Sequence, residues 1–191
     1  MGGGPVEPDG IAVLRRRLRL AMVVAGAAIL AGLGLVVATS GSEPDGSTDP
    51  VAFDLPALGE DGRVRLADFR GTPVVVNFFA SWCTSCDFEL PGFVAAADAL
   101  RGEVTFIAVN ALETGDWKDM AERHQLREHG FVLARDIGGR EGSGLHAALG
   151  GRGMPITAFY DEDGVLVDGV GGALPESALF EKLRQLYDVE L

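Results

Sequence analysis

The chain has 191 residues, enough for one membrane segment and one domain with an ordinary hydrophobic core. Its formal net charge is -12 at pH 7. The first 38 residues, with four arginines against two acidic residues, carry +2, so the rest carries -14. An acidic domain repels the phosphate backbone of DNA and RNA, which argues against a nucleic acid partner.

The N-terminal segment predicts a membrane anchor. Residues 20–38 contain no charged or strongly polar side chain, and as a helix they would span roughly 28 Å at about 1.5 Å per residue, which is one bilayer core. We therefore expect a cytoplasmic tail over residues 1–17 and a transmembrane helix over residues 18–38. Because Arg15 and its neighbours precede this helix, the positive-inside tendency places the N-terminus in the cytoplasm and the rest of the chain outside.

A cleaved signal peptide is the alternative for this segment, since residues 36–38 resemble a cleavage site with small residues. The apolar stretch is longer than that of a usual signal peptide, which favours an uncleaved anchor. Residues 39–50 have the composition of a solvated linker. The prediction is a single-pass protein of the cell membrane. Its N-terminal helix lies in the lipid bilayer, and one catalytic domain over residues 51–191 lies on the extracytoplasmic side.

The folded domain is predicted to begin with a hairpin and to continue with alternating strands and helices. Residues 53–56 and 63–66 flank a turn-rich stretch at 59–62 and predict a short β-hairpin. The nearly continuous apolar run Val74–Phe79 is typical of a central strand covered on both faces. The elements expected next are a helix at 86–100, with Pro91 kinking it or ending a first turn, a strand at 104–109 and a helix at 116–129.

Shorter elements are expected after these: a strand at 131–134, a helix at 143–149 and a strand at 156–160. A tight turn at 161–164 leads into a strand at 165–170, so the last two strands should be antiparallel. A helix at 175–187 closes the chain. Strands that alternate with helices and end in a hairpin predict an α/β domain with one central mixed β-sheet flanked by helices, which is the thioredoxin arrangement.

Both cysteines of the chain lie in the tetrad Cys83-Thr84-Ser85-Cys86. A strand ending at 80–81 and a helix opening near Thr84 place Cys83 at a helix N-terminus, where unpaired N–H groups and the helix dipole lower the pKa of a thiol. One helical turn brings Cys86 close enough to form a disulfide. The pair is therefore predicted to be a reversible two-electron switch in which Cys83 attacks and Cys86 resolves.

Two other roles are open to a Cys-x-x-Cys pair. A structural zinc site needs four ligands, and the histidines at 124, 129 and 146 lack the spacing of a zinc finger. A purely structural disulfide fits an oxidising compartment, but a two-residue loop removes little chain entropy. Redox chemistry fits the pattern better than either, and we expect no metal.

Several further motifs accompany the cysteines: Phe53-Asp54-Leu55-Pro56, Leu66-Ala67-Asp68-Phe69-Arg70-Gly71, Asn77-Phe78-Phe79-Ala80-Ser81-Trp82-Cys83, Glu89-Leu90-Pro91 and Gly153-Met154-Pro155. With them, residues 51–191 resemble the membrane-anchored thioredoxin-like oxidoreductases of the TlpA/ResA/CcmG type. The resemblance implies a thioredoxin fold, here extended by the N-terminal β-hairpin and preceded by one transmembrane helix. It implies no cofactor besides the redox-active disulfide Cys83–Cys86.

The resemblance also assigns residues around the cysteines. It implies a cis peptide bond before Pro155, which would turn the backbone beside Met154 toward the sulfurs and let it pair with an extended partner chain. An ordinary trans proline that opens the next strand is the alternative. The resemblance further implies a functional glutamate at Glu89, which lies three residues after Cys86 on one helix face and can serve the buried thiol as proton acceptor. A solvated surface glutamate is the alternative.

The sequence also supports expectations for other residues near the site. Trp82 is expected to cover the disulfide and offer partners an apolar contact, with a place in the core as the alternative. Asn77 occupies the position at which thioredoxins often carry a buried aspartate. The glycine-rich stretches 138–140 and 150–153 are expected to be flexible loops beside the active site, and His146 is expected to be a helix residue without a catalytic part.

These features predict an extracytoplasmic, membrane-anchored thiol-disulfide oxidoreductase that exchanges disulfides with client proteins. The resemblance implies that apocytochrome c is such a client during cytochrome c maturation, and that a membrane thiol transporter is the electron donor. Two other functions stay open. Peroxiredoxin-type thiol peroxidases share the scaffold, but Trp82 and Cys86 replace the polar surroundings of a peroxidatic cysteine. Copper-binding assembly factors hold the metal with two cysteines and a histidine, but typically space the cysteines further apart.

Overall fold

The structure, a computed structural model, describes residues 51–138 and 144–191. The tail, anchor and linker predicted over residues 1–17, 18–38 and 39–50 lie outside this part. In the two described segments, no helix has both the length and the apolar character needed to cross a membrane.

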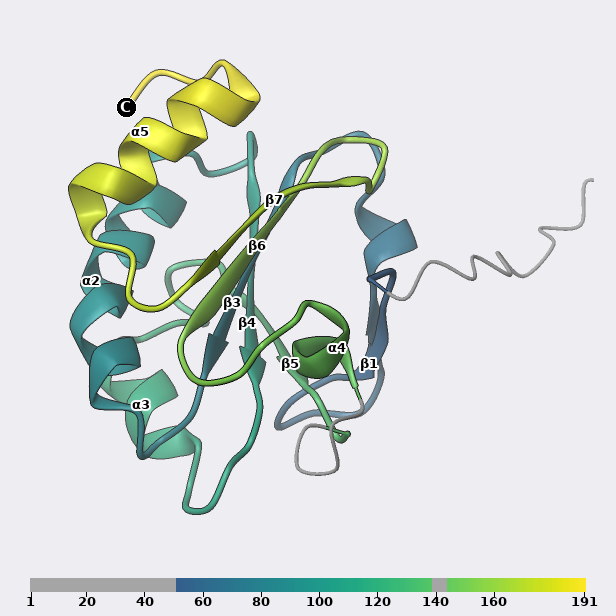
Figure 1. The fold of residues 1–191 in the computed structure, drawn as a ribbon, viewed down its shortest axis with the longest axis vertical. Helices are drawn as coiled ribbons and strands as arrows, with labels where there is room; N and C mark the ends of the chain where they lie inside the picture. The colour runs from purple at the N-terminus through teal and green to yellow at the C-terminus, as the bar shows by residue number, and fades with distance from the viewer. Residues whose placement is uncertain (1–50, 139–143) are drawn as a thin grey trace, which may run out of the picture. The chain divides into compact units, whose positions relative to one another are not determined.

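A five-stranded sheet forms the centre of the domain (Figure 1). Its strands lie in the order β5-β4-β3-β6-β7, with bounds Val74–Phe79 for β3, Thr105–Asn110 for β4, Val132–Arg135 for β5, Ile156–Tyr160 for β6 and Leu166–Gly171 for β7. β3 pairs parallel with β4, and β4 pairs parallel with β5. The β3–β6 and β6–β7 pairs are antiparallel. The predicted mixed sheet and its antiparallel final hairpin are confirmed.

β3 is the central strand because apolar side chains dominate both of its faces, with Asn77 as its one polar residue, and all six of its residues are buried. Val75 and Phe79 point into the core on one side of the sheet. Val74, Val76 and Phe78 point into the core on the other side, as the alternation of side chains along a strand requires. The carboxyl end of β3 is therefore firmly packed at the point where the chain turns into the cysteine motif.

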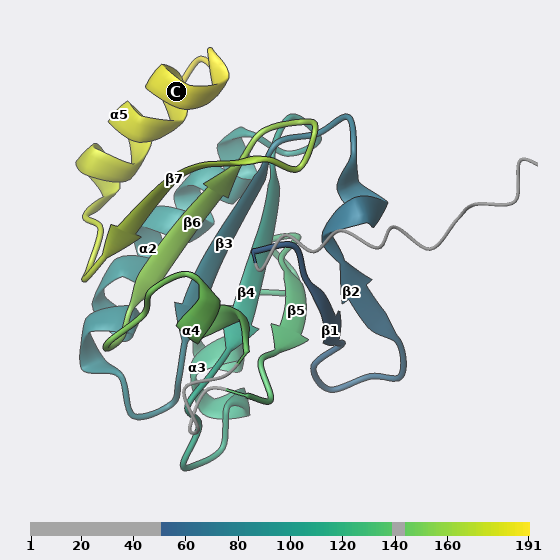
Figure 2. The ribbon, with the colours of Figure 1, turned by 45° about the vertical axis from the view of Figure 1, so that its right-hand side comes forward.

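Different elements cover the two faces of the sheet. The face of Val75 and Phe79 carries the helices α2 (Thr84–Ala99), α3 (Lys118–Arg123) and α5 (Glu176–Tyr187). In Figure 2, α2 and α3 lie behind the sheet, and α5 lies at the upper left beyond the edge strand β7. The opposite face carries the strands β1 (Asp54–Pro56) and β2 (Arg63–Arg65), the 3-10 helix η1 (Leu66–Phe69) and the short helix α4 (Leu145–Ala148). β1 and β2 form an antiparallel pair in which Leu55 lies opposite Val64.

The helix predicted over residues 116–129 is wrong in its extent. α3 covers only Lys118–Arg123, and Gln125 adopts a left-handed φ of 48°. A left-handed residue ends a helix, and here it turns the chain so that Leu126 enters the core. The burial of Leu126 therefore overrides the helical pattern of the sequence.

The structure makes two smaller expectations more specific. Pro91 lies inside α2, which continues from Thr84 to Ala99, so the proline does not end a first turn. α4 covers Leu145–Ala148 within the predicted range 143–149, whose first residue lies outside the described part.

Candidate active site

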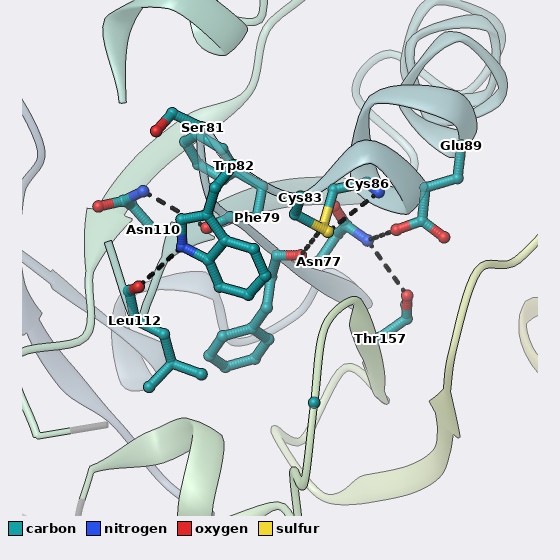
Figure 3. The surroundings of a disulfide bond; sticks show 12 residues. Asn77, Phe79, Ser81, Trp82, Cys83, Cys86, Glu89, Asn110, Leu112 and Thr157 are labelled. Atoms are coloured by element: carbon teal, nitrogen blue, oxygen red, sulfur yellow. Dashed lines mark hydrogen bonds between the residues drawn. A yellow bond between two sulfur atoms is a disulfide. The ribbon is translucent and has the colours of Figure 1, made fainter. Parts of the chain in front are cut away.

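The cysteines lie where β3 gives way to α2, as the sequence predicts. Cys83 is the N-cap residue of α2, and its sulfur forms a disulfide with Cys86 over a Cα–Cα distance of 5.2 Å (Figure 3). The backbone N–H of Cys86 points at the Cys83 sulfur, 3.1 Å away. A helix N-terminus with an N–H directed at a sulfur favours negative charge on that sulfur.

The two sulfurs have different surroundings. Cys83 is 4% exposed, whereas Cys86 is completely buried. The Cys86 sulfur lies 3.7 Å from the carbonyl oxygen of Phe78, an acceptor that in the reduced protein favours a neutral thiol. The surroundings of Cys83 therefore favour a thiolate, and those of Cys86 favour a protonated thiol.

The peptide bond between Met154 and Pro155 is cis, as the resemblance implies. This bond precedes β6, whose residue Thr157 lies opposite Asn77 of the antiparallel strand β3. Since β3 runs on toward Cys83 while β6 begins just after Pro155, the cis bond and the cysteines share one end of the sheet. Met154 packs against the core cluster that includes both cysteines.

Glu89 is buried, with 2% of its surface exposed, which rules out the alternative of a solvated surface glutamate. One carboxylate oxygen accepts a hydrogen bond from the Asn77 side-chain amide at 2.7 Å, and the other accepts one from the Leu174 N–H at 2.7 Å. Burial raises the pKa of Glu89 to about 7, although both hydrogen bonds act to lower it. Glu89 therefore exchanges a proton near neutral pH.

The side chain of Asn77 is buried, and only its amide nitrogen makes hydrogen bonds. Its amide nitrogen donates to Glu89 and, at 3.3 Å, to the hydroxyl of Thr157. Its side-chain oxygen is buried and has no hydrogen-bond partner among the residues that the structure describes. Rotation of the amide would turn this oxygen toward Glu89, so Asn77 can donate to the carboxylate or accept from the carboxylic acid.

Trp82 is 48% exposed, which rules out the alternative that it is a core residue. Its indole N–H donates to the carbonyl of Leu112 at 2.9 Å (Figure 3). This bond fixes one edge of the ring against the loop after β4, while the ring faces outward beside Cys83. An apolar surface next to the disulfide is thus available to another molecule.

Glu113 belongs to the site and was not singled out from the sequence. Its carboxylate accepts hydrogen bonds from the backbone N–H of Ser81 at 2.9 Å, the Ser81 hydroxyl at 2.6 Å and the Asn110 amide at 2.8 Å. Partial burial acts to raise the pKa of Glu113, but these bonds and one from the Gly115 N–H outweigh it and lower the pKa to about 2. The signal in the sequence was its place just after a strand parallel to β3, because parallel strands end at one edge of a sheet.

Asp87 follows Cys86 in the chain and is paired. Its carboxylate lies 2.6 Å from the His124 ring nitrogen and 2.8 Å from the Arg123 guanidinium. The hydrogen bond with His124 is the main cause that lowers the pKa of Asp87, against a smaller opposing effect of burial. The pairing ties the first turn of α2 to α3 and reduces the effect of the Asp87 charge on the neighbouring cysteines.

A hollow of about 480 Å³ opens beside the cis peptide bond. It is lined by the loop 149–155, by the start of β6 and by β7, where glycines at 169 and 171 leave the surface without side chains. The residues Gly150–Gly153, which were expected to form a loop beside the active site, line this hollow. Gly139 and Arg140 of the other glycine-rich stretch lie outside the described part. In the segments that the structure covers, no three histidine, cysteine or acidic side chains come together as a metal site would require.

Of the predicted site residues, Cys83, Cys86, Glu89 and Trp82 gather at the junction of β3 and α2 (Figure 3). Met154 and Pro155 lie at the same end of the sheet, directly before the neighbouring strand β6. His146 is different, because it packs into the core on the face opposite α2, against the ring of Phe78.

Comparisons with known proteins agree with this geometry. The model of the AhpC/TSA family matches residues 48–168. The thiol:disulfide interchange protein DsbE of Pseudomonas fluorescens biotype C is 33% identical over 138 residues, which are 71% of this chain and 72% of that protein. HelX of Rhodobacter capsulatus, also a thiol:disulfide interchange protein, is 30% identical over 138 residues, 71% of this chain and 73% of that protein. The thiol-disulfide oxidoreductase ResA of Bacillus thuringiensis subsp. konkukian is 27% identical over 130 residues, 66% of this chain and 70% of that protein.

Solved structures share the fold. The exposed lipoprotein thioredoxin Etrx1 of Streptococcus pneumoniae superimposes with a TM-score of 0.57 at 25% identity, over 71% of this chain and 99% of that one. A secreted disulfide oxidoreductase of Mycobacterium tuberculosis gives a TM-score of 0.57 at 20% identity, over 73% of this chain and 100% of that one. With its thioredoxin fold and its Cys-x-x-Cys pair, the chain belongs to the AhpC/TSA family, as a thiol-disulfide oxidoreductase of the kind that includes DsbE, ResA and HelX.

Proposed function

We propose that the chain is a membrane-anchored oxidoreductase that reduces disulfides in extracytoplasmic client proteins, with Cys83 as the attacking residue and Cys86 as the resolving one. The observation that carries this assignment is the difference between the two sulfurs. The Cys83 sulfur accepts a hydrogen bond from the Cys86 N–H, and Cys83 is the more exposed of the two cysteines. Cys86 is completely buried, and its sulfur lies near a carbonyl oxygen. Only the thiolate is a nucleophile, so the first attack falls to Cys83.

The reaction has two exchange steps. The Cys83 thiolate attacks one sulfur of the client disulfide, which forms a mixed disulfide and releases the other client sulfur as a thiolate. Cys86 then loses its proton and attacks the Cys83 sulfur, which releases the second client sulfur as a thiolate. The client gains two electrons, and the protein is left with the Cys83–Cys86 disulfide seen in the structure. No other cofactor is needed.

Glu89 accepts the proton that Cys86 loses. The two residues are three apart on α2 and lie on one face of the helix. A carboxyl group with a pKa of about 7 is suited to this task, because it can both take up and release a proton near neutral pH. Asn77 stays hydrogen-bonded to Glu89 in both protonation states by rotating its amide.

Client contact falls to the surface around the disulfide. Trp82 offers an exposed apolar ring on one side, and Met154 and Pro155 offer backbone groups on the other. The hollow beside Pro155 is open and floored by glycine residues, which leaves room for an extended chain. The relatives that are thiol:disulfide interchange proteins support a client that carries a disulfide or thiols. From the resemblance to the TlpA/ResA/CcmG type, we propose apocytochrome c as this client and a membrane dithiol protein as the electron donor.

Trapping tests the roles of the cysteines. In membranes that contain the full-length Cys86→Ser variant, Cys83 should hold clients as mixed disulfides that mass spectrometry identifies. The Cys83→Ser variant should hold none. Trapping on Cys86 would reverse the roles, and an absence of c-type apocytochromes among the captured proteins would remove the proposed client.

Protease accessibility tests the location. If residues 18–38 form an uncleaved anchor, protease added to intact, wall-stripped cells should remove the domain, and the domain should sediment with membranes. Full protection would contradict the extracytoplasmic location. Release of a form that begins near Thr39 would instead establish a cleaved signal peptide.

A further inference from the structure

His146 makes a hydrogen bond that reaches the loop before the cis peptide bond. The residue is buried on α4, and its ring meets the ring of Phe78 edge-on, with the ring centres 5.6 Å apart. Its Nε2 atom lies 3.0 Å from the carbonyl oxygen of Gly153. A carbonyl oxygen can only accept a hydrogen bond, so Nε2 carries the hydrogen and donates.

Gly151 is shaped to this ring. A Cβ atom at position 151 would lie 2.4 to 2.7 Å from three atoms of the His146 ring, distances that side chains do not show. Its N–H donates to the His146 carbonyl at 2.9 Å, so the loop closes around the histidine from both sides. The backbone of Gly151 is not left-handed, which means that the ring, and not the conformation, excludes a side chain here.

α4 is itself attached to the central sheet. The N–H of His146 donates to the buried carboxylate of Asp136 at 2.7 Å, and the N–H of Asp136 donates to the carbonyl of Asn110 at the end of β4 at 2.9 Å. Contacts thus run without a break from the sheet through Asp136 and His146 to Gly153. Met154 and Pro155 follow directly in the chain.

We propose that His146 is a positioning residue for client binding: it holds the Gly153 carbonyl, and through it the Met154–Pro155 backbone, in the arrangement that pairs with an extended client chain. The inference deepens the proposed function and rests on client contact at Met154. His146 touches neither cysteine nor client, so its loss should weaken peptide binding and leave the chemistry of the disulfide unchanged.

Steady-state kinetics of the full-length protein test this, with dithiothreitol as the reductant that regenerates the Cys83 and Cys86 thiols after each turnover. The substrates are an oxidised Cys-x-x-Cys-His peptide, the haem-attachment pattern, and bis(2-hydroxyethyl) disulfide, which is too small to need the loop. For His146→Leu we expect the KM of the peptide to rise about three- to tenfold, with kcat and the rate on the small disulfide within twofold of wild type. His146→Gln, whose amide can replace the Nε2–H donor, should recover most of the peptide KM.

His129→Leu is the matched control. It removes a partly exposed histidine that pairs with Asp98 near the far end of α2, about 20 Å along the helix from Cys83. This variant should leave the KM and kcat on both substrates unchanged. An unchanged peptide KM in His146→Leu, or an equal loss on both substrates, would overturn the inference. If wild type itself fails on the peptide while it reduces the small disulfide, the proposed client class fails, whatever His146 does.

A second pair of variants keeps the test decisive if His146→Leu does not fold. Gly151→Ala keeps the histidine at position 146, but the added methyl group displaces its ring from Gly153. This variant should therefore raise the peptide KM as His146→Leu does. In the double variant His146→Ala, Gly151→Ala, the methyl group added at position 151 meets no ring, but the Nε2–H donor to Gly153 is also missing. The peptide KM should therefore stay high. Recovery of the wild-type KM in this double variant would show that only space matters and would overturn the inference.

Nitrogen-15 NMR of histidine-labelled protein gives a direct reading of the bond. We expect His146 to be the Nε2–H tautomer in the wild type and to lose this fixed state in Gly151→Ala. A wild-type His146 protonated on Nδ1 alone could not donate to Gly153 and would rule the proposal out.

Discussion

The side-chain amide of Asn77 donates a hydrogen bond to the Glu89 carboxylate over 2.7 Å, although only 1% of Asn77 and 2% of Glu89 are exposed. The bond joins the central strand β3 to α2, the helix that begins at the cysteines. An amide does not titrate, so Glu89 is the acid-base group of the pair.

Glu89→Gln should slow the resolving step about tenfold or more, because the buried thiol of Cys86 loses its proton acceptor. Wild type should show a rate that rises with pH through about 7, the pKa of Glu89, and the variant should lack this rise. Stopped-flow reduction over a pH series measures both. Asp98→Asn makes the same chemical change on an exposed part of α2 and should leave the profile intact. Superimposable profiles for wild type and Glu89→Gln would remove the proton-transfer role.

Stability should also depend on pH through Glu89. The pKa is raised from 4.5 to about 7, so between these values the folded protein holds a proton that the unfolded chain has released. The contribution of Glu89 to the free energy of unfolding is therefore fully present below pH 4.5 and is lost as pH rises through about 7, by at most about 3 kcal/mol. Denaturant unfolding from pH 4.5 to 8 should show Glu89→Gln gaining on wild type. Parallel curves, or a gain for wild type, would contradict the burial of an ionisable Glu89.

Glu113→Gln should destabilise the domain by about 2 kcal/mol, since hydrogen bonds to a carboxylate from Ser81 and Asn110 are weakened. The pKa of Glu113 is lowered to about 2, so its contribution to stability is present above pH 4.5 and is lost as pH falls toward 2. The loop should also loosen around Trp82. A Trp117→Phe background leaves Trp82 as the one tryptophan of the chain, whose fluorescence should shift to the red in Glu113→Gln. An unshifted spectrum would show that Glu113 does not hold this loop.

Asp87→Asn should make the disulfide easier to reduce. The substitution removes a negative charge beside Cys86 and leaves Arg123 and His124 without their carboxylate, and both changes favour a thiolate at Cys83. We expect the reduction potential to rise by roughly 10 to 30 mV. Equilibration with glutathione measures the potential, and Asp119→Asn on α3 is a suitable control. A fall in potential would contradict this account.

The local parts of the site were predictable from the sequence. The apolar run Val74–Phe79 identifies a buried strand, and the cysteine tetrad after it identifies a strand-to-helix junction. Both rest on neighbouring residues. The cis bond before Pro155 depended on the resemblance, since spacing does not distinguish it from a trans bond.

The contacts that tune the site were not predictable, because their partners are distant in the chain. Glu89 meets the N–H of Leu174, 85 residues away, and Ser81 meets Glu113, 32 residues away. The early end of α3 likewise comes from the burial of Leu126 and the left-handed Gln125. Such contacts depend on how helices and loops pack on the sheet, which hydrophobic patterns do not specify.

In the proposed reaction, Cys83 is the nucleophile and Cys86 the resolving thiol. Brief alkylation of the reduced full-length protein at neutral pH, followed by mass spectrometry of the peptide that holds both cysteines, tests it most directly. We expect Cys83 to be modified first, because its sulfur accepts a hydrogen bond from the Cys86 N–H and is partly exposed, while Cys86 is completely buried. Modification of Cys86 before Cys83 would contradict this assignment of roles.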